Sequence, residues 1–377
     1  MEISGIEIYA LILMLMFGGL FFTALFNVIF PPSLKNAKEP KDFPFISVLI
    51  PARNEEQNIK TCLESLAKQN YPNFEILVLD DNSTDKTKTV VENFTFNEPK
   101  VKLINGKELP LGWLGKNWAC QQLGEKAKGE ILIFTDADTK HSPNAVLQTI
   151  GWIEKLDLGV LSTFPQQITK TFWEKLIVPV IDVFVYGMLP MWLTYYSKSP
   201  LFAAANGQWI AIKRGSYTKI GEHQSVRNKI VEDVELSRIA KTKGIKTLLT
   251  SGTDSIFCRM YKSKEEIWEG FSKNLFGITG SNSFVFWFLI LLLLNACILP
   301  FLLFPFSGLF LILIFLNIVF RALIALKFKH SFFESVILHP FGILAISVIG
   351  INSFFKTKFG KVSWKGRSID LKLEDKN

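Results

Sequence analysis

Long apolar runs near both ends of the chain enclose a charged middle, and this separation limits what the chain can fold into. Residues 8–30 carry no charge, and a helix of this length crosses the ~30 Å hydrocarbon core of a bilayer. A second apolar block, residues 284–326, suits two further spans, and residues 332–355 form another candidate that includes polar groups. Because 49% of the residues are hydrophobic while 20% are charged, the pattern predicts a membrane protein with a water-soluble part.

The charges beside the apolar runs predict the orientation in the membrane. Lys35, Lys38 and Lys41 follow the first run, whereas Glu2 and Glu7 precede it. The positive-inside rule therefore places the middle of the chain in the cytoplasm. Three full spans after it would put the basic tail outside, against the same rule. We therefore expect one C-terminal apolar segment to be re-entrant or interfacial, with the tail cytoplasmic.

These patterns predict four parts along the chain. Residues 1–33 are expected to form a transmembrane anchor, because they lack the basic leader and cleavage site of a signal peptide. Residues 41–280 have the mixed composition of a soluble domain. Membrane helices are expected in residues 281–356, followed by a basic cytoplasmic tail in residues 357–377.

Composition also narrows the possible partners. The net charge of +8 suits an anionic membrane surface or a phosphorylated substrate, and no arginine-rich or aromatic-basic array indicates nucleic acid. The four cysteines show no paired short spacing, so neither a zinc site nor a disulfide framework is predicted. Segments 173–196 and 265–276 are rich in aromatic and aliphatic residues. Such segments are typical of interfacial helices, and also of helices buried in a core.

The soluble part alternates short apolar runs with amphipathic patterns. Strands are predicted at residues 45–50, 74–79, 101–104 and 131–135, and helices at residues 57–69, 84–93 and 119–127. This alternation predicts an α/β fold with a mostly parallel sheet covered by helices. On such sheets, ligands bind beyond the carboxyl ends of the strands.

Polar motifs follow three of the predicted strands, at residues 51–56, 80–85 and 136–139. One interpretation is that they are polar loops with helix-capping residues such as Ser83 or Thr84. Asp136 and Asp138 favour another, because residues two apart in an extended segment point to the same side. Both carboxylates would then face one cation, Mg²⁺ or Mn²⁺, bound together with a phosphorylated substrate.

A series of motifs, taken in order, resembles the membrane-bound family 2 glycosyltransferases. They are SVLIPARNEEQNI, ILVLDDNSTDKT, GWLGKNWA, DADT, NGQWIAIKR, VEDVEL, CRMYKSKEEIWEGFSKN and VSWKGR. The nearest likeness is to enzymes that glycosylate lipids, namely the carotenoid-acid, hopanoid-associated and ceramide glycosyltransferases. The resemblance implies a GT-A-type nucleotide-sugar-binding domain with an N-terminal transmembrane anchor and C-terminal transmembrane helices, in a bacterial-type inner or plasma membrane.

The resemblance also implies roles for the first two strand ends. Ala52, Arg53 and Glu55 would line the nucleotide pocket. Asp81 would meet the base of the nucleotide. The donor would be a UDP- or GDP-sugar.

The resemblance places the diphosphate at the third strand end. Asp136 would lie near the ribose and phosphate, and Asp138 would hold the Mg²⁺ or Mn²⁺ that bridges the diphosphate. Lys116 would lie near the diphosphate or the donor sugar. The alternative for Lys116 is a solvated loop lysine.

Transfer of a sugar also requires a base, because the acceptor hydroxyl loses a proton as it attacks. Glu232 and Asp233 stand at a predicted helix start, where the helix dipole alone also favours acids. By resemblance to the family's Glu-Asp motif, Asp233 would be the base of an inverting displacement. The preceding loop, residues 206–208, would shape the acceptor pocket.

Cationic residues near the C-terminus are candidates for stabilising the leaving diphosphate. They are Arg259, Lys365 and Arg367. The Gln-x-x-Arg-Trp motif of the polymer-making members is missing at Arg259, which weakens that assignment and argues against a processive synthase. For the two tail residues, a positive-inside anchor is an equal alternative.

Together these features predict an inverting, metal-dependent, non-processive glycosyltransferase with a membrane lipid acceptor of polyisoprenoid, carotenoid, hopanoid or sphingoid type. A nucleotidyltransferase-like enzyme on a similar fold is one alternative, although the segment PARNEEQN lacks the glycine-rich loop that it would need. A transporter or a non-enzymatic membrane scaffold is another.

Overall fold

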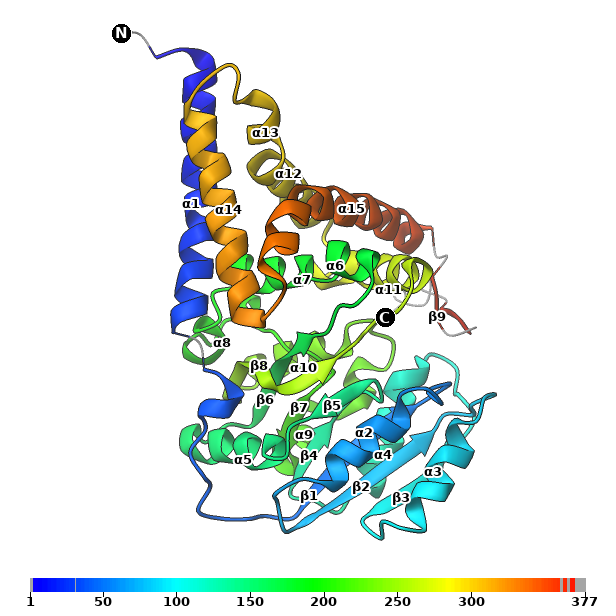
Figure 1. Ribbon diagram of the computed structural model, residues 1–377. Coiled ribbons are helices and arrows are strands. Elements are labelled where there is room, and N and C mark those ends of the chain that lie inside the picture. Colours follow the sequence, from blue (N-terminus) through cyan, green and yellow to red (C-terminus); the bar gives the residue numbers. More distant parts are fainter. Residues whose placement is uncertain (1–2, 31, 360–361, 365–366, 370–377) are drawn as a thin grey trace. The chain divides into compact units, whose positions relative to one another are not determined.

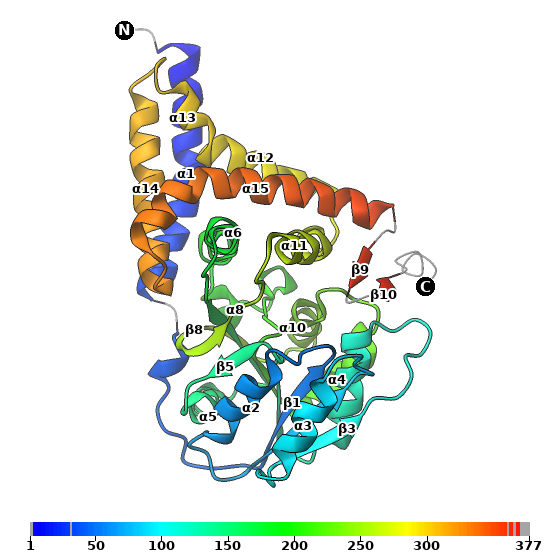
Figure 2. The same ribbon diagram turned by 45° about the vertical axis from the view of Figure 1, so that its right-hand side comes forward.

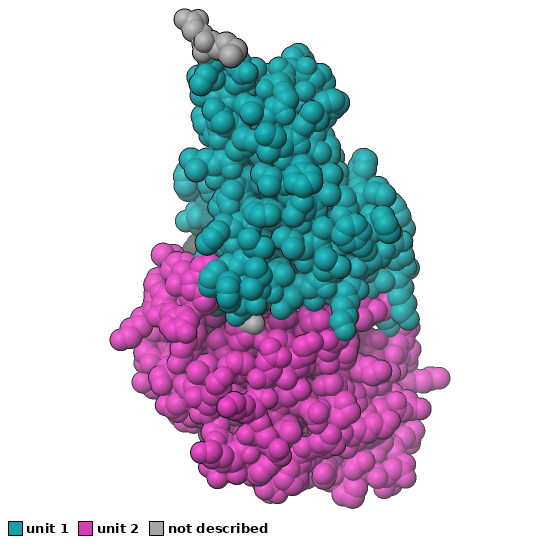
Figure 3. Space-filling model, turned by 60° about the vertical axis from the view of Figure 1, so that its left-hand side comes forward, with its two compact units in different colours: residues 1–31, 169–191, 261–372 teal, residues 32–168, 192–260, 373–377 magenta. Residues whose placement is uncertain are grey.

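The alternation of apolar strands and amphipathic helices builds one eight-stranded sheet in the computed structural model, which describes residues 3–30, 32–359, 362–364 and 367–369 (Figure 1). The chain divides into two compact units, coloured in Figure 3. Unit 1 comprises residues 1–31, 169–191 and 261–372, and unit 2 comprises residues 32–168, 192–260 and 373–377.

Unit 2 contains the sheet, whose strand order is β3-β2-β1-β4-β7-β6-β8-β5. The strands are β1 (Ile46–Ala52), β2 (Phe74–Asp80), β3 (Val101–Asn105), β4 (Ile131–Phe134), β5 (Thr139–His141), β6 (Val160–Gln167), β7 (Ile210–Lys213) and β8 (Thr247–Cys258). β1 runs parallel to β2 and β4, and β2 runs parallel to β3. The carboxyl ends of β2, β1 and β4 therefore meet at one edge of the sheet.

The predicted α/β fold is confirmed, but the sheet is more mixed than expected. β7 runs antiparallel to both β4 and β6, and β5 runs antiparallel to β8. Because β7 is antiparallel to β4, the segment that precedes β7 lies at the same edge as the segment that follows β4. This reversal brings the loop of residues 206–208 beside the strand ends that carry the acids.

Helices cover both faces of the sheet (Figure 2). One core cluster joins the strands to α2 (Ile59–Ala67), α3 (Thr87–Thr95) and α5 (Ala145–Leu156). A second cluster joins them to α4 (Gly115–Lys126), α9 (Arg214–Ile220) and α10 (Glu232–Thr242). The remaining helices of unit 2 are short: η1 (Leu34–Asn36), α8 (Leu193–Tyr196), η3 (Pro200–Phe202) and η4 (His223–Val226). The predicted strands and helices up to β4 all exist, with ends shifted by a few residues.

The described residues of unit 1 form helices and one short antiparallel pair of strands. Its helices are α1 (Gly5–Ile29), α6 (Phe172–Ile177), α7 (Val180–Val183), η2 (Phe184–Met188), α11 (Lys264–Ile278), α12 (Ser283–Cys297), α13 (Leu299–Leu303), α14 (Leu309–Phe328) and α15 (Phe332–Lys358). The two strands are β9 (Val362–Trp364) and β10 (Arg367–Ile369).

Three described helices are long and apolar enough to cross a membrane, namely α1, α14 and α15. The block predicted to hold two spans contains only one helix of that length, α14. The other, α12, has 15 residues and is too short alone at ~1.5 Å per residue. α12 is long enough to cross a membrane only if it is counted together with α11, from which it is bent by 116°. A break of this kind occurs in broken spans and re-entrant segments.

The apolar face of α11 packs inside unit 1. Ile267 and Phe271 are buried, and the Phe276 amide donates a hydrogen bond to Ser353 Oγ of α15 at 3.0 Å. A second bond joins Asn352 Nδ2 to Ser272 Oγ at 2.7 Å. The apolar spacing in segment 265–276 therefore reflects, at least on this face, a helix–helix contact. An interfacial position for the exposed face, which carries Trp268, stays a prediction.

Candidate active site

The first two polar loops are locked together beyond the ends of β1 and β2. The Asn54 amide donates to Ser83 Oγ at 3.1 Å, and the Thr84 amide donates to Asn54 Oδ1 at 2.8 Å. Asn54 and Asn82 both adopt positive φ, 54° and 52°, a conformation that asparagine tolerates better than most residues. Ser83 and Thr84 thus join the two loops rather than cap α3, whose Thr87 amide bonds to Asp85.

The residues expected around the nucleotide all lie at this junction. Ala52 is buried, and its carbonyl accepts the Asp81 amide at 2.8 Å. Arg53 Nη1 donates to the backbone carbonyls of Asp81 and Asn82, so the guanidinium holds the second loop in place. The Glu55 amide donates to Thr87 Oγ1 at 2.7 Å. A role for these residues in nucleotide binding stays a prediction.

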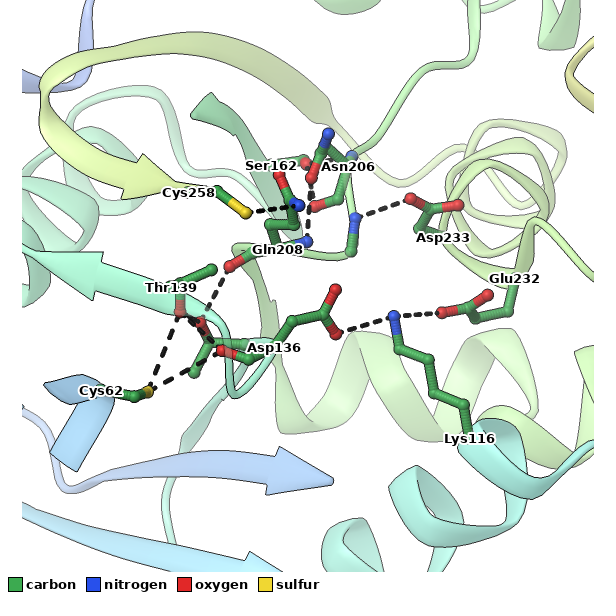
Figure 4. A network of polar contacts seen from close by, with 12 residues as sticks. Cys62, Lys116, Asp136, Thr139, Ser162, Asn206, Gln208, Glu232, Asp233 and Cys258 are labelled. Carbon is green, nitrogen blue, oxygen red and sulfur yellow. Dashed lines mark hydrogen bonds and ion pairs between the residues drawn. The ribbon is translucent and has the colours of Figure 1, made fainter. Parts of the chain in front are cut away.

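Lys116 is held between two carboxylates (Figure 4). Its Nζ lies 2.8 Å from Asp136 Oδ1 and 3.0 Å from Glu232 Oε1. Burial alone would lower the pKa of Lys116, but attraction to the two carboxylates outweighs burial and raises this pKa well above its usual range. Lys116 is therefore a paired cation in α4 and not a loop lysine, and 37% of its side chain is exposed.

The start of α4 positions this lysine. Asn117 Nδ2 donates to the backbone carbonyls of Val226 and Lys229 at 2.8 and 2.9 Å. The Leu114 amide donates to the Arg227 carbonyl at 2.8 Å. These bonds pin the first turn of α4 to the segment that leads into α10, so Lys116 and Glu232 are brought together from distant parts of the sequence.

Asp233 lies in the first turn of α10, as predicted, and faces the loop before β7. Its Oδ2 accepts the Gly207 amide at 2.6 Å, and its Oδ1 accepts the Val234 amide at 2.8 Å. Burial, followed by repulsion from Glu232, raises the pKa of Asp233 to about 7, against opposing effects of Lys116 and the two amides. A carboxylate with such a pKa is suited to general-base chemistry near neutral pH.

A small cavity lies among these charged groups. Lys116, Asp136, Gly207, Glu232 and Asp233 line it, and the remaining lining residues are Pro51, Cys120, Phe134, Thr135, Ile210, His223 and Leu236. A Cβ added at Gly207 would lie 3.1 Å from Lys116 Nζ, so the absence of a side chain there leaves room for the lysine.

The segment of Asp136 and Asp138 is a turn, which corrects the expectation of an extended strand. β4 ends at Phe134, and the Thr139 amide folds back to the Asp136 carbonyl. Asp136 pairs with Lys116, whereas Asp138 hydrogen-bonds with the Cys258 thiol. The argument that two-residue spacing aims both carboxylates at one point therefore fails, because the alternation of a strand does not apply in a turn.

The donor set of this turn fits a cation that shares its ligands with a substrate. Within the described ranges, no group of three or more His, Cys, Asp or Glu side chains is placed to hold a metal. One or two carboxylates are nevertheless the usual protein contribution to Mg²⁺ bound with substrate phosphates. The turn carries two such carboxylates, Asp136 and Asp138, and either of them can make that contribution.

Comparison with known proteins identifies a domain of known family within the chain. Residues 47–212 match the model of Glycosyl transferase family 2. The chain carries a family 2 glycosyltransferase domain. The match spans β1 to β7, including the three acidic strand ends and Lys116, and it confirms the resemblance predicted from the motifs.

Similar proteins extend the likeness beyond that domain. This glycosyltransferase is 26% identical over 354 residues to a 4,4'-diaponeurosporenoate glycosyltransferase of Staphylococcus aureus (strain USA300), covering 87% of this chain and 89% of that protein. The protein of the same name from Staphylococcus haemolyticus is 26% identical over 274 residues, 71% of each chain. A mannosyltransferase from Pyrobaculum calidifontis, solved with GDP-Man and Mn²⁺, shares the fold with a TM-score of 0.57 and 17% identity, over 93% of this chain and 98% of that one.

Of the three cationic candidates, only Arg259 belongs to the unit that contains the cavity. Arg259 directly follows β8 and does not line the cavity. Arg367 begins β10 in unit 1, and Lys365 lies outside the described residues. Stabilisation of the diphosphate by these three residues stays a prediction.

Sequence reasoning missed the buried polar side chains beneath the acidic turn. They are Cys62, Ser65, Thr135, Thr139 and His141. Three of them flank the acids within the segment TDADTKH, which is the only signal that the sequence offers. Cys62 and Ser65 belong to α2, and nothing in the sequence links that helix to the turn.

The raised pKa of Asp233 predicts a pH-dependent stability. The folded-state pKa of about 7 exceeds the ordinary value of 3.8, so between these pH values the folded state binds more protons than the unfolded state. Stability contributed by the protonated carboxyl is thus full below pH ~4 and is lost as the pH rises through about 7. We expect Asp233→Asn to melt at a higher temperature than the wild type at pH 8, with a smaller difference at pH 5. A difference equal at both pH values would contradict the raised pKa.

Proposed function

We propose that this glycosyltransferase moves one sugar from a nucleotide-sugar donor to a membrane lipid acceptor by an inverting displacement. The observation that carries the proposal is the position of Asp233. Its carboxyl group, with a pKa of about 7, lies in a cavity that also contains Lys116 and Asp136. A base and the groups that suit a diphosphate therefore share one site.

The proposed reaction is a single exchange of bonds. The acceptor oxygen transfers its proton to the Asp233 carboxylate as it attacks the anomeric carbon. The bond from that carbon to the diphosphate oxygen breaks, and the nucleoside diphosphate leaves with the electron pair. Attack from the side opposite the leaving group inverts the configuration. No covalent sugar–protein intermediate is needed.

Lys116 and the acidic turn are proposed to receive the diphosphate. Lys116 Nζ already binds two carboxylates, so this cation is placed where anionic groups gather. A divalent cation, when bound to Asp136 and Asp138, neutralises charge that the leaving diphosphate develops. The mannosyltransferase of the same fold was solved with GDP-Man and Mn²⁺, which makes Mn²⁺ and guanosine donors, beside UDP-sugars, natural first probes.

A lipid acceptor is proposed from the relatives and from unit 1. The similar staphylococcal proteins are named for diaponeurosporenoate, a carotenoid acid, and unit 1 contains three helices suited to a membrane. We propose an apolar isoprenoid acceptor that ends in a hydroxyl or carboxyl group. The basic residues Lys35, Lys38 and Lys41 after α1 support a cytoplasmic catalytic unit. The family 2 glycosyltransferase domain argues against a non-enzymatic membrane scaffold.

The experiment that tests this proposal is nucleoside diphosphate release by the purified, detergent-solubilised protein. A panel of UDP- and GDP-sugars is offered with Mn²⁺ or Mg²⁺ and with hydroxyl- or carboxyl-ended polyisoprenoids. We expect release from one donor, dependent on the acceptor and on the cation. Folded protein that releases no diphosphate from any donor, with each acceptor present, would contradict the proposal.

A further inference from the structure

A buried layer of hydrogen bonds lies directly beneath the acidic turn of unit 2. His141 is at its centre, with 3% of its surface exposed and its ring 4.8 Å from that of Trp209. Its Nε2 lies 3.1 Å from both Thr135 Oγ1 and Thr139 Oγ1. Its Nδ1 lies 3.1 Å from Ser65 Oγ. Among the residues that the structure describes, the hydrogen-bond partners of the imidazole are all hydroxyl groups.

The hydroxyl protons fix the form of the imidazole. Ser65 Oγ has one proton and donates it to the Cys62 carbonyl at 2.8 Å, so it can only accept from His141 Nδ1. Nδ1 is therefore the protonated nitrogen. Burial lowers the pKa of His141 to about 3, which leaves Nε2 unprotonated and able to accept.

Three acceptors then meet three donors above the ring. The acceptors are His141 Nε2 and the carbonyls of Asp136 and Gln208. The donors are the hydroxyls of Thr135 and Thr139 and the thiol of Cys62, whose Sγ lies 3.8 Å from the Asp136 carbonyl oxygen. Each threonine hydroxyl has a single proton, so His141 Nε2 competes with the Gln208 and Asp136 carbonyls for the protons of Thr135 and Thr139. A side chain without an acceptor at this position would remove the one nitrogen that contacts both hydroxyls.

These bonds connect the two halves of the active site. Thr139 Oγ1 lies 2.6 Å from the Asp136 carbonyl oxygen, and Thr135 Oγ1 lies 2.8 Å from the Gln208 carbonyl oxygen, while both hydroxyls also contact His141 Nε2. Gln208 follows Gly207, whose amide bonds to the Asp233 carboxylate. Figure 4 shows Asp136 and Gln208 close to Thr139. His141 Nε2 contacts the hydroxyls of both threonines, so its ring links the Asp136 turn to the Gln208 loop.

We propose that His141 is a positioning residue that fixes the Asp136–Asp138 turn against the loop carrying Gly207, and so sets the affinity for the nucleoside diphosphate and its cation. The inference deepens the proposed function and rests on it. His141 touches neither reactant. It acts by holding the backbone of the residues that would bind the nucleoside diphosphate and its cation.

The test is Mn²⁺ binding in the presence of UDP or GDP, whichever binds the wild type, measured by electron paramagnetic resonance and by calorimetry. His141→Phe keeps a ring beside Trp209 and removes both nitrogens. Loss of groups that orient metal ligands typically costs ~10–100-fold in affinity, and we expect a decrease in that range. Thr139→Val is also expected to lower the affinity for Mn²⁺ and nucleotide. Thr139→Ser keeps the hydroxyl and is expected to have the affinity of the wild type.

A matched control separates this role from general core packing. Thr163 and Thr250 form another buried hydroxyl pair in unit 2, and their Oγ1 atoms are 2.9 Å apart. Among the described residues, the hydrogen bonds of Thr163 do not include the Asp136–Asp138 turn. Thr163→Val should lower the melting temperature without changing Mn²⁺–nucleotide affinity.

Wild-type-like affinity in His141→Phe, or an equal loss in Thr163→Val, would overturn the inference. If His141→Phe does not fold, the comparison of Thr139→Val with Thr139→Ser decides: equal affinities would contradict the role. A wild type that binds neither UDP nor GDP with Mn²⁺ would instead count against the proposed function itself.

Discussion

Asp233→Asn is expected to lower the rate of sugar transfer to a hydroxyl acceptor by ~10²–10⁴-fold, the usual contribution of a general base. Asparagine keeps the size of the side chain, and its oxygen can still accept the Gly207 amide, which now bonds at 2.6 Å. The substitution removes the capacity to take a proton, together with the oxygen that accepts the Val234 amide at 2.8 Å. Binding of the donor nucleotide should therefore change little, and the decrease should appear in kcat.

The chemistry of the acceptor provides an internal control for this variant. A carboxyl-ended acceptor has already lost its proton at neutral pH, so its transfer should depend less on Asp233 than transfer to an alcohol. The wild-type rate with the alcohol should also rise with pH through about 7, the pKa of the Asp233 carboxyl, because the base must be ionised. Full alcohol transfer by Asp233→Asn would exclude this residue as the base.

Asp138→Asn is expected to lower transfer by ~10²–10³-fold, comparable to removal of one group that stabilises developing charge. The amide has nearly the same volume as the carboxylate and can still bond the Cys258 thiol, so the turn should persist. What is lost is the negative charge that would hold a divalent cation against the diphosphate. We therefore expect weaker Mn²⁺ binding in the presence of nucleotide, and partial recovery of the rate at high Mn²⁺.

A second aspartate in unit 2 serves as the control. Asp254 is on the same strand as Cys258 and pairs with Lys35 at 3.0 Å at a partly exposed position outside the cavity. Asp254→Asn removes the same charge and should leave Mn²⁺ affinity unchanged. Equal Mn²⁺ affinity in Asp138→Asn and the wild type would remove Asp138 from the cation site.

The sequence predicted the acidic strand ends because their positions depend on local patterns. Apolar runs defined β1, β2 and β4, and parallel strands place their carboxyl ends together. Asp233 was correctly placed at a helix start, but its proposed role came from resemblance to the family's Glu-Asp motif. These features depend on periodicity and on a motif order that resembles a known family.

Other features depend on tertiary contacts and had no local signal. The antiparallel pairing of β7 with β4 brings Gly207 to Asp233, and no pattern within residues 206–213 indicates that direction. The bridge from Lys116 to Asp136 and Glu232 joins three distant segments. The turn at Asp136 was predicted wrongly as extended, because an apolar run does not indicate at which residue the strand ends.

The membrane part shows a similar limit. Hydropathy found α1, α14 and α15, since span length and composition are local properties. From hydropathy, two spans were predicted in residues 284–326, where the structure has α14 and the short α12. The proline and glycine residues between these helices did not indicate where each helix would end. The apolar face of α11 was ambiguous for the same reason: burial by α15 and burial by lipid select the same side chains.

The most direct test of the central claim is mass spectrometry of the lipid product. The purified wild type and Asp233→Asn are incubated with the donor identified by diphosphate release, Mn²⁺ and an isoprenoid alcohol, and the lipids are extracted. The account predicts a lipid heavier by one sugar residue, formed by the wild type and reduced at least a hundredfold in the variant, in line with the ~10²–10⁴-fold contribution of a general base. Diphosphate release without any glycosylated lipid, or the same lipid formed equally by both proteins, would contradict it.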